Sequence, residues 1–234
     1  MSEGGGRERG PGERALSSSP HLLPFCLSAG KGGAVTARTT DAATGLATID
    51  ITGPSSAATF IACPPDAAVR AGGGLAVRLP WLDVLLKPLP APSGPPLPAP
   101  PGPPLPTQAT AIDITVRDAG GGTRRLRAST AHRAPPRITP AGAILPLALD
   151  PAPASGWCRV RLDLAALLAR AYPAGAPFAE VVALRIHAAC RLRCVYFADR
   201  AYPEGELPPE FRLVVGAGKD AAAPPASSPP VACV

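Results

Sequence analysis

The sequence predicts an all-β protein, an antiparallel β-sandwich of jelly-roll type with one short α-helix. In many short segments apolar and polar residues alternate with a period of two, which is typical of strands with one buried face. Turn-forming Gly, Pro and Asp residues separate these segments, and a single segment shows the apolar spacing of a helix. This order of elements favours two packed antiparallel sheets over a fold of alternating strands and helices.

The 234-residue chain is expected to hold one domain with low-complexity additions. Residues 1–20 predict a disordered leader and residues 217–234 a disordered tail, because both are rich in Gly, Pro, Ser or Ala. The β-sandwich domain is expected over residues 21–216, with an interruption at 88–108. That interruption is a proline-rich loop, which favours polyproline II structure. Its P-x-x-P triplets suggest a ligand for SH3 or WW domains, and the alternative is an expanded low-complexity loop.

In the first half of the domain, alternation predicts strands at Ala47–Thr52, Ala58–Ala62 and Gly74–Leu79. The second of these ends where Cys63-Pro64-Pro65 forbids further pairing in a central strand. The run Trp81–Lys87 fits either a helical turn or a strand, and its length does not distinguish the two.

In the second half, a hairpin is expected to join strands Ala111–Arg117 and Thr123–Ser129 through the turn Asp118–Gly122. The apolar stretch Ala143–Leu149 contains Pro146, which marks an edge or a bulge. Further strands are expected at Trp157–Leu162 and Phe211–Val215. The one helix begins after the N-cap Asp163, covers Leu164–Tyr172 and stops at Pro173.

The longest alternating segment is Glu180–Arg200. Strands average about 5–6 residues, so we expect a bend or bulge near Ala189–Arg191, or two consecutive strands. One face is predicted to be buried, and its residues are Val182, Leu184, Ile186, Ala188, Cys190, Leu192, Cys194 and Tyr196. The opposite face is predicted to be wetted and carries Arg185, His187, Arg191 and Arg193.

Positive charge suggests the chemistry of a partner. The net charge is +6, which favours an acidic partner. The arginines on wetted strand faces are the candidate partner-binding residues, namely Arg125, Arg127, Arg159, Arg161, Arg185, Arg191 and Arg193. Either some of them form one docking face for an acidic surface, or they are separate solvated charges on different strands. Nucleic acid is the less favoured partner, because aromatic residues for base stacking make up only 4% of the chain.

No motif for catalysis or cofactor binding is recognised, so we expect neither an enzyme nor a cofactor. Cys190 and Cys194 with His187 could suggest a metal site, but on a strand His187 points away from both cysteines. Two buried core thiols are the favoured interpretation. The chain shows neither a signal peptide nor a membrane-spanning run, which predicts a soluble intracellular protein with reduced cysteines.

Several segments resemble the cilia- and flagella-associated protein 20 family. The resemblance is most specific in Leu184–Arg200 and its continuation Tyr202–Phe211. Other matching segments follow in the same order along the chain, and these are Phe60–Pro64, Arg124–Ser129, Gly156-Trp157 and Leu164–Tyr172. The leader, the proline-rich loop and the tail have no counterpart in the compact family domain, which indicates a diverged paralogue.

The resemblance implies a non-enzymatic structural protein of the ciliary or flagellar axoneme, with a further cytoplasmic pool. Family members line the inner junction of doublet microtubules, so tubulin and a helical-repeat protein of the parkin co-regulated type are the implied partners. No catalytic residue, cofactor or membrane contact is implied. From the residues alone, the alternative is an adaptor or nucleic-acid-associated β-sandwich that uses its proline-rich loop as an SH3 or WW ligand.

Overall fold

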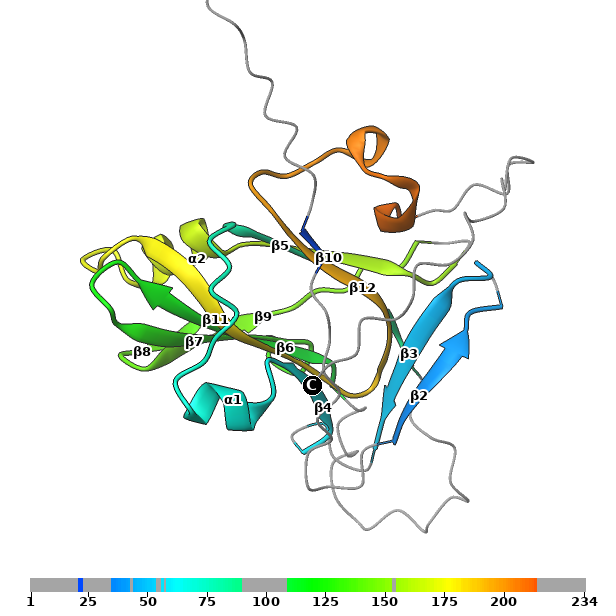
Figure 1. Cartoon of the computed structure of the whole chain (residues 1–234), viewed down its shortest axis with the longest axis horizontal. Coiled ribbons are helices and arrows are strands. Elements are labelled where there is room, and N and C mark those ends of the chain that lie inside the picture. The colour runs from blue at the N-terminus through cyan, green and yellow to red at the C-terminus, as the bar shows by residue number, and fades with distance from the viewer. Residues whose placement is uncertain are drawn as a thin grey trace, which may run out of the picture.

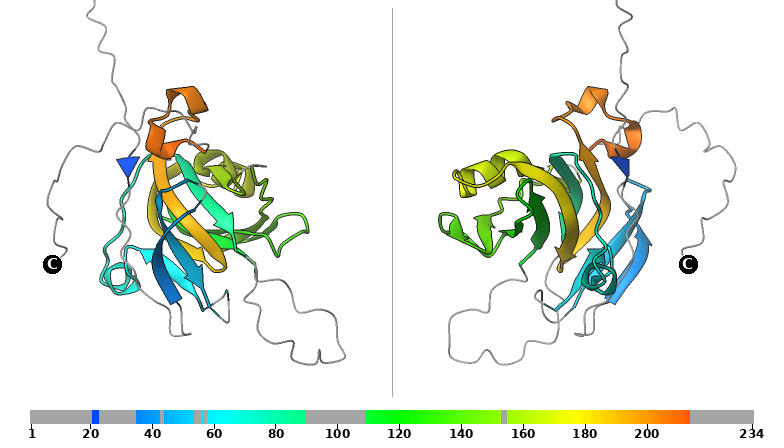
Figure 2. Two further views of the ribbon diagram at one scale, coloured as in Figure 1. Left: turned by 90° about the vertical axis from the view of Figure 1, so that its right-hand side faces the viewer. Right: turned by 60° about the vertical axis from the view of Figure 1, so that its left-hand side comes forward.

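The computed structural model describes residues 21–22, 35–42, 44–53, 56, 58–89, 109–152 and 155–213. Two six-stranded sheets, here sheet A and sheet B, pack face to face (Figures 1 and 2), which confirms the predicted β-sandwich. The expected leader and tail lie outside the described residues, as does the proline-rich loop beyond Leu89. Within the described part of the chain, no helix has the length and apolarity needed to cross a membrane.

Sheet A is antiparallel throughout. Its main path runs in the order β10 (Cys158–Asp163), β5 (Trp81–Pro88), β12 (Cys190–Ala198), β3 (Ala47–Thr52) and β2 (Val35–Thr40). The short strand β1 (His21–Leu22) also pairs with β12. The run Trp81–Lys87, whose sequence fits either a helical turn or a strand, forms a strand that lies inside the sheet between β10 and β12.

Sheet B runs in the order β4 (Phe60–Cys63), β11 (Phe178–His187), β6 (Ala111–Asp118), β7 (Thr123–Ser129), β9 (Gly142–Pro146) and β8 (Arg137–Thr139). The predicted hairpin of β6 and β7 is confirmed, whereas the parallel pairing of β7 with β9 was not expected. A glycine is required in this pair, because a Cβ at Gly142 would lie 2.2 Å from the Arg125 carbonyl oxygen.

The main core fills the space between the two sheets, and β6 shows how alternation builds it. Ile112, Ile114 and Val116 are each at most 1% exposed, as the period of two predicts. Leu82, Val84 and Leu86 of β5 meet them from sheet A in the same buried cluster. The helix α2 (Leu164–Ala171) adds Leu164 and Leu168 to this cluster. Its N-cap is confirmed, since the Asp163 carboxylate accepts a hydrogen bond from the Ala166 N–H at 2.9 Å.

The long alternating segment forms two strands, β11 and β12, that belong to different sheets. Ala188 and Ala189 make the crossing and are buried. Their backbone groups have partners, because the Ala188 N–H donates to the Thr59 carbonyl at 2.9 Å and the Thr110 hydroxyl donates to the Ala189 carbonyl at 3.1 Å. The expected break near Ala189–Arg191 is therefore a passage from one layer of the sandwich to the other.

The expected orientation of residues after Leu192 is wrong. The pairing register of β12 with β5 shifts between Leu192 and Cys194, so Val195 and Phe197 enter the main core instead. Tyr196 is buried on the outer face of sheet A, and the partly buried Cys194 packs beside it. His187 was expected to be wetted, but it is 2% exposed, and the Asp113 carboxylate of β6 and the Phe60 ring of β4 lie against it.

Two predicted strands are absent from the described residues. In Gly74–Leu79 only Val77 forms an isolated bridge, with Val181, and Ala76 has a φ of +52°, which breaks an extended run. In Phe211–Val215 the described residues 211–213 hold no strand, and Phe211 ends the 3₁₀ helix η2 (Pro209–Phe211). A short helix, α1 (Asp66–Arg70), was not expected.

A second, smaller apolar cluster lies on the outer face of sheet A. It consists of Leu85, Tyr196, Leu207 and Phe211, where the last two come from the segment that holds η1 (Glu204–Glu206) and η2. The rings of Tyr196 and Phe211 lie 4.7 Å apart between centroids. The C-terminal segment seen above the sheets in Figure 1 therefore packs on the sandwich as an integral part of it.

We expect Phe211→Ala to lower the free energy of unfolding by about 3–5 kcal/mol, because it removes a buried ring from this cluster. Urea denaturation followed by tryptophan fluorescence measures the change. Ile138→Ala is the matched control, since Ile138 is 46% exposed and its truncation should cost less than about 0.5 kcal/mol. An equal effect of the two substitutions would contradict the packed role of the C-terminal segment.

Candidate partner-binding surface

The structure divides the seven candidate arginines between the two outer faces of the sandwich. Arg159 and Arg161 of β10 and Arg191 and Arg193 of β12 belong to sheet A. The other three belong to sheet B, and they are Arg125 and Arg127 of β7 and Arg185 of β11. Arg185 therefore lies on the opposite outer face of the sandwich from Arg191 and Arg193.

Asp83 of β5 organises two of the arginines on sheet A. Its carboxylate is 1% exposed and accepts hydrogen bonds from Arg159 at 3.1 Å and from Arg161 at 2.9 Å. Arg159 also donates to the Phe211 carbonyl at 2.8 Å, and Arg161 donates to the Tyr202 carbonyl at 2.9 Å. Both arginines thus join the sheet to the C-terminal segment.

Arg193 has a similar role. Its guanidinium donates to the carbonyl oxygens of Arg212 at 2.8 Å and Glu210 at 3.0 Å, both in the C-terminal segment. Arg159 completes this contact through an ion pair with Glu204 at 2.6 Å. Because these donors satisfy backbone carbonyls and carboxylates of the same chain, Arg159, Arg161 and Arg193 hold the fold together.

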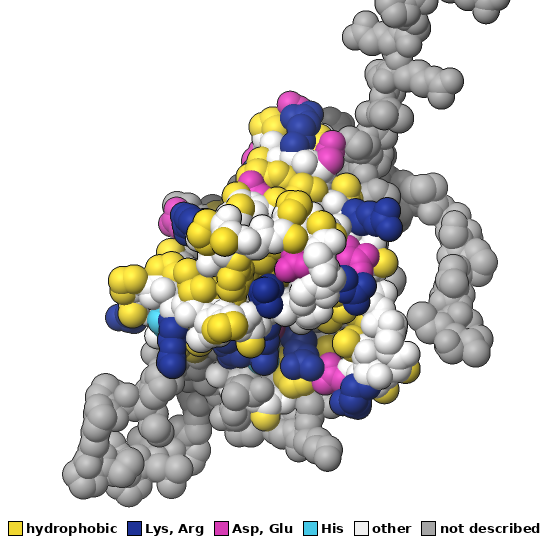
Figure 3. All heavy atoms as spheres, turned by 90° about the vertical axis from the view of Figure 1, so that its left-hand side faces the viewer, with side chains coloured by type: hydrophobic (Ala, Val, Ile, Leu, Met, Phe, Trp, Pro, Cys, Tyr) yellow, Lys and Arg dark blue, Asp and Glu magenta, His cyan; other side chains and the backbone are white. Residues whose placement is uncertain are grey.

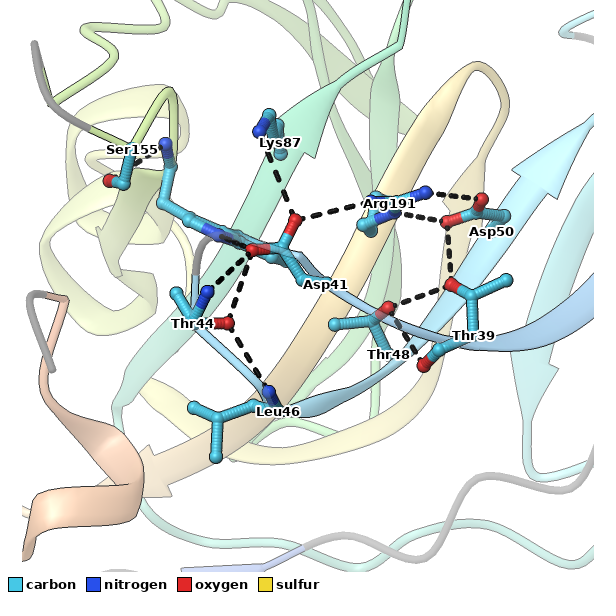
Figure 4. A network of polar contacts seen from close by, with 10 residues as sticks. Thr39, Asp41, Thr44, Leu46, Thr48, Asp50, Lys87, Ser155 and Arg191 are labelled. Carbon is cyan, nitrogen blue, oxygen red and sulfur yellow. Dashed lines mark hydrogen bonds and ion pairs between the residues drawn. The ribbon is translucent and has the colours of Figure 1, made fainter.

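Arg191 belongs to a network around Asp41, which follows β2 (Figure 4). Asp41 is 1% exposed and accepts from Arg191 at 3.1 Å and from the Trp157 indole N–H at 3.4 Å, with Lys87 at 3.8 Å. Burial would raise the pKa of Asp41, but the hydrogen bonds from Arg191 and Trp157 outweigh it and lower the pKa. Arg191 also forms a bidentate pair with Asp50, to which its Nε donates at 2.6 Å and its Nη2 at 2.8 Å.

On sheet B a buried carboxylate again gathers the arginines, and we call Asp113, Arg125, Arg127 and His187 the Asp113 cluster. Asp113 of β6 is 3% exposed. Its carboxylate pairs with Arg125, with Arg127 at 3.1 Å and with the His187 Nε2 at 2.7 Å. The His187 Nδ1 lies 2.8 Å from the Ser56 carbonyl, so both ring nitrogens face acceptors.

Burial and the neighbouring cationic and hydrogen-bonding groups set the pKa of Asp113. Burial raises it, whereas hydrogen bonds from His187 and Arg125 and the nearby charge of Arg127 lower it, and the net direction is downward from 3.8. The carboxylate is therefore ionised at neutral pH. It balances only part of the positive charge around it, since two arginines share it.

Arg185 lies on the same outer face, nearer to α1. It pairs with Asp66 at 2.9 Å, and its guanidinium lies 5.0 Å from the centroid of the Phe60 ring. Its side chain stays 33% exposed. A hollow of 190 Å³ separates Arg185 from Arg125, and Asp113 and Thr115 line it between them.

A larger hollow of 390 Å³ lies on the other side of Arg125, and we call it the arginine hollow. Its lining comes from β7, β9, β8 and the turn before β9, and consists of Arg125, Arg127, Arg137, Thr139, Ala141, Gly142, Ala143 and Ile144. Basic side chains form a band across the side of the molecule toward which β7 and β8 lie (Figure 3). The exposed Arg137 forms no ion pair within the described part of the chain.

The outer surface of sheet B therefore remains the candidate for partner binding. Four of its arginines, Arg125, Arg127, Arg137 and Arg185, face two carboxylates, Asp66 and Asp113, which leaves a formal charge of +2. The sequence analysis did not identify Arg137, because its three-residue strand β8 shows no alternating pattern. It also missed Asp113, although the pattern Ile112-Asp113-Ile114 placed this carboxylate on the face of the arginines.

Cys190 and Cys194 are thiols shielded from water to different degrees, and the Cys190 thiol donates to the His187 carbonyl at 3.5 Å. Burial raises the pKa of Cys190 to about 12 and that of Cys194 to about 11, so both thiols stay protonated at neutral pH. His187 turns its ring toward Asp113 instead of either cysteine. No group of three or more potential metal ligands occurs among the described residues.

The lowered pKa of Asp113 predicts acid sensitivity. Its stabilising contribution is fully present above the unfolded pKa of about 3.9 and is lost as the pH falls through the lower folded value. Thermal denaturation from pH 7 to 3 should therefore show a fall in Tm below about pH 4. At pH 7, Asp113→Asn should cost about 2–3 kcal/mol, because it leaves the cations of the Asp113 cluster without their anion. The same substitution should make Tm fall less steeply below about pH 4, because the titrating carboxylate is removed.

Asp66→Asn serves as the matched control for this experiment. The Asp66 carboxylate is 31% exposed and pairs with one partly exposed arginine, so its loss should cost less than about 1 kcal/mol. If Asp113→Asn proved no more destabilising than Asp66→Asn, the central role of Asp113 would be disproved.

Comparison with known proteins supports the resemblance seen in the sequence. The model of the CFA20 domain matches residues 20–215. Cilia- and flagella-associated protein 20 of Chlamydomonas reinhardtii is 31% identical over 176 residues, covering 75% of this chain and 78% of that protein. The proteins of the same name in Paramecium tetraurelia and Caenorhabditis elegans are 31% and 30% identical over 165 residues, covering 72% and 68% of their lengths and 70% of this chain. The chain therefore belongs to the CFA20 domain family, among the cilia- and flagella-associated proteins.

Proposed function

We propose that this chain is a non-enzymatic structural component of the axoneme that binds doublet microtubules through the outer face of sheet B. Membership in the CFA20 domain family supports the axonemal setting. The observation that carries the binding surface is the surplus of arginines over carboxylates on sheet B, with Arg125 half exposed and Arg137 exposed. Such a surface attracts and orients an acidic partner.

Tubulin is the proposed partner, because an acidic protein surface is complementary to this face. A helical-repeat protein of the parkin co-regulated type, implied by the family resemblance, is a second candidate neighbour at an inner-junction-like position. Sheet A is less suited to the same role, since Arg159, Arg161, Arg191 and Arg193 donate to carboxylates and carbonyls of their own chain. A partner would have to compete with those contacts.

The structure also decides which substitutions test the proposal. Replacing Arg191 or Arg193 would disturb the Asp41 network or the C-terminal segment, so lost binding would not distinguish a contact from misfolding. Arg137 and Arg38 offer a matched pair. Both are exposed arginines in edge strands, β8 of sheet B and β2 of sheet A, which lie at opposite ends of the molecule (Figure 1).

We expect Arg137→Glu to weaken co-sedimentation with taxol-stabilised microtubules by about tenfold at low salt, because it reverses a charge within the binding surface. Arg38→Glu changes the net charge equally and should pellet like the unsubstituted protein. Equal pelleting of all three proteins, with unchanged Tm, would overturn the assignment of sheet B. Equal weakening by both substitutions would show that only net charge matters.

A further inference from the structure

The arginine hollow has the make-up of a binding site for a specific kind of side chain. Three guanidinium groups, from Arg125, Arg127 and Arg137, line a space of 390 Å³. This volume lies in the range of pockets that accept a ligand, about 300–1,000 Å³. The three arginines come from β7 and β8, and β9 separates these two strands, so the positive groups border the hollow from two sides.

Much of the hydrogen-bonding capacity of these arginines is uncommitted within the described residues. Arg125 contacts Asp113 through Nη2, and Arg127 contacts it through Nη1. Arg137 donates to no carboxylate of the described chain. A guanidinium carries five N–H donors in a planar fork that matches a carboxylate. The hollow can therefore offer paired donors to an incoming anion without breaking the Asp113 cluster.

The remaining lining is small and largely apolar. Ala141, Gly142, Ala143 and Ile144 contribute no charge, and Thr139 contributes one hydroxyl, which already donates to the Gly142 carbonyl at 3.0 Å. A side chain at Gly142 is excluded, because its Cβ would lie 2.2 Å from the Arg125 carbonyl oxygen. Arginine donors beside an apolar lining suit a ligand that has methylene groups and a terminal carboxylate.

We propose that the arginine hollow binds glutamate side chains of an extended acidic peptide segment. The carboxylates would accept hydrogen bonds from Arg137 and from the free donors of Arg125 and Arg127, and the methylenes would lie on Ala141 and Ile144. None of the described residues that line the hollow is aromatic, so they offer a nucleic acid no stacking platform. The inference rests on the proposed function, since the segment would belong to the axonemal partner.

Isothermal titration calorimetry on the full chain tests the site with a hexaglutamate peptide whose ends are blocked. We expect binding that weakens as salt is added, and no binding of hexaglutamine. Arg137→Ala should weaken the affinity for hexaglutamate by about tenfold, the effect of losing a hydrogen bond to a charged group. Unaltered affinity in this variant would overturn the proposal.

A second variant blocks the hollow without removing an arginine. Ala141→Glu places a competing carboxylate beside Arg125 and Arg137 and should abolish peptide binding. The backbone carbonyl of residue 141 still accepts the hydrogen bond from the Arg125 N–H. Ala47→Glu is the matched control, because Ala47 is exposed on β3 of sheet A and its substitution adds the same charge. Equal affinities of these two variants would place the peptide elsewhere and overturn the proposal.

Two further ligands separate this inference from its competitors. An oligothymidylate or a phosphoserine peptide that binds more tightly than hexaglutamate would overturn the choice of a carboxylate ligand. Microtubule pelleting by Ala141→Glu distinguishes a failure of the peptide site from a failure of the proposed function. If pelleting persists while peptide binding is lost, the proposed function survives without the hollow as its contact, and the inference for the partner fails.

Discussion

Buried aspartates on the outer faces of both sheets are the constraint on which the polar surface of this molecule depends. Asp41, Asp83 and Asp113 are each at most 3% exposed, although none of them lies in the core between the sheets. An ionised carboxylate in such a place is stable only with charged hydrogen-bond donors around it. Arginines supply those donors, which explains why many of them form ion pairs within the chain.

This constraint also sorts the arginines by function. Around Asp41 and Asp83, backbone carbonyls and further carboxylates satisfy the guanidinium groups, and the result is a clamp on the C-terminal segment and on the β2–β3 hairpin. Around Asp113, two arginines share a single carboxylate, and donors on both stay uncommitted among the described residues. On sheet B, Arg125 and Arg137 therefore keep exposed positive charge beside the arginine hollow.

Local pattern was sufficient for much of the fold. The alternation in Ile112, Ile114 and Val116 and the cap at Asp163 were correct because burial on one face and capping are decided within a few residues. The positive φ of Ala76 and the register shift after Leu192 could not be predicted, because tertiary contacts impose them on residues of ordinary type. The strand that holds Arg137 could not be predicted for a similar reason, since these three residues form a strand through their pairing with β9.

The crossing at Ala188 and Ala189 gives the sandwich a direct path for mechanical load. Arg185 on β11 and Arg191 on β12 are six positions apart in one continuous backbone, yet they face outward from opposite sheets. A pull on the outer face of sheet B thus reaches the interior of sheet A through covalent bonds, with no need to pass through side-chain packing. The covalent crossing therefore opposes sliding of the two layers of this protein past one another.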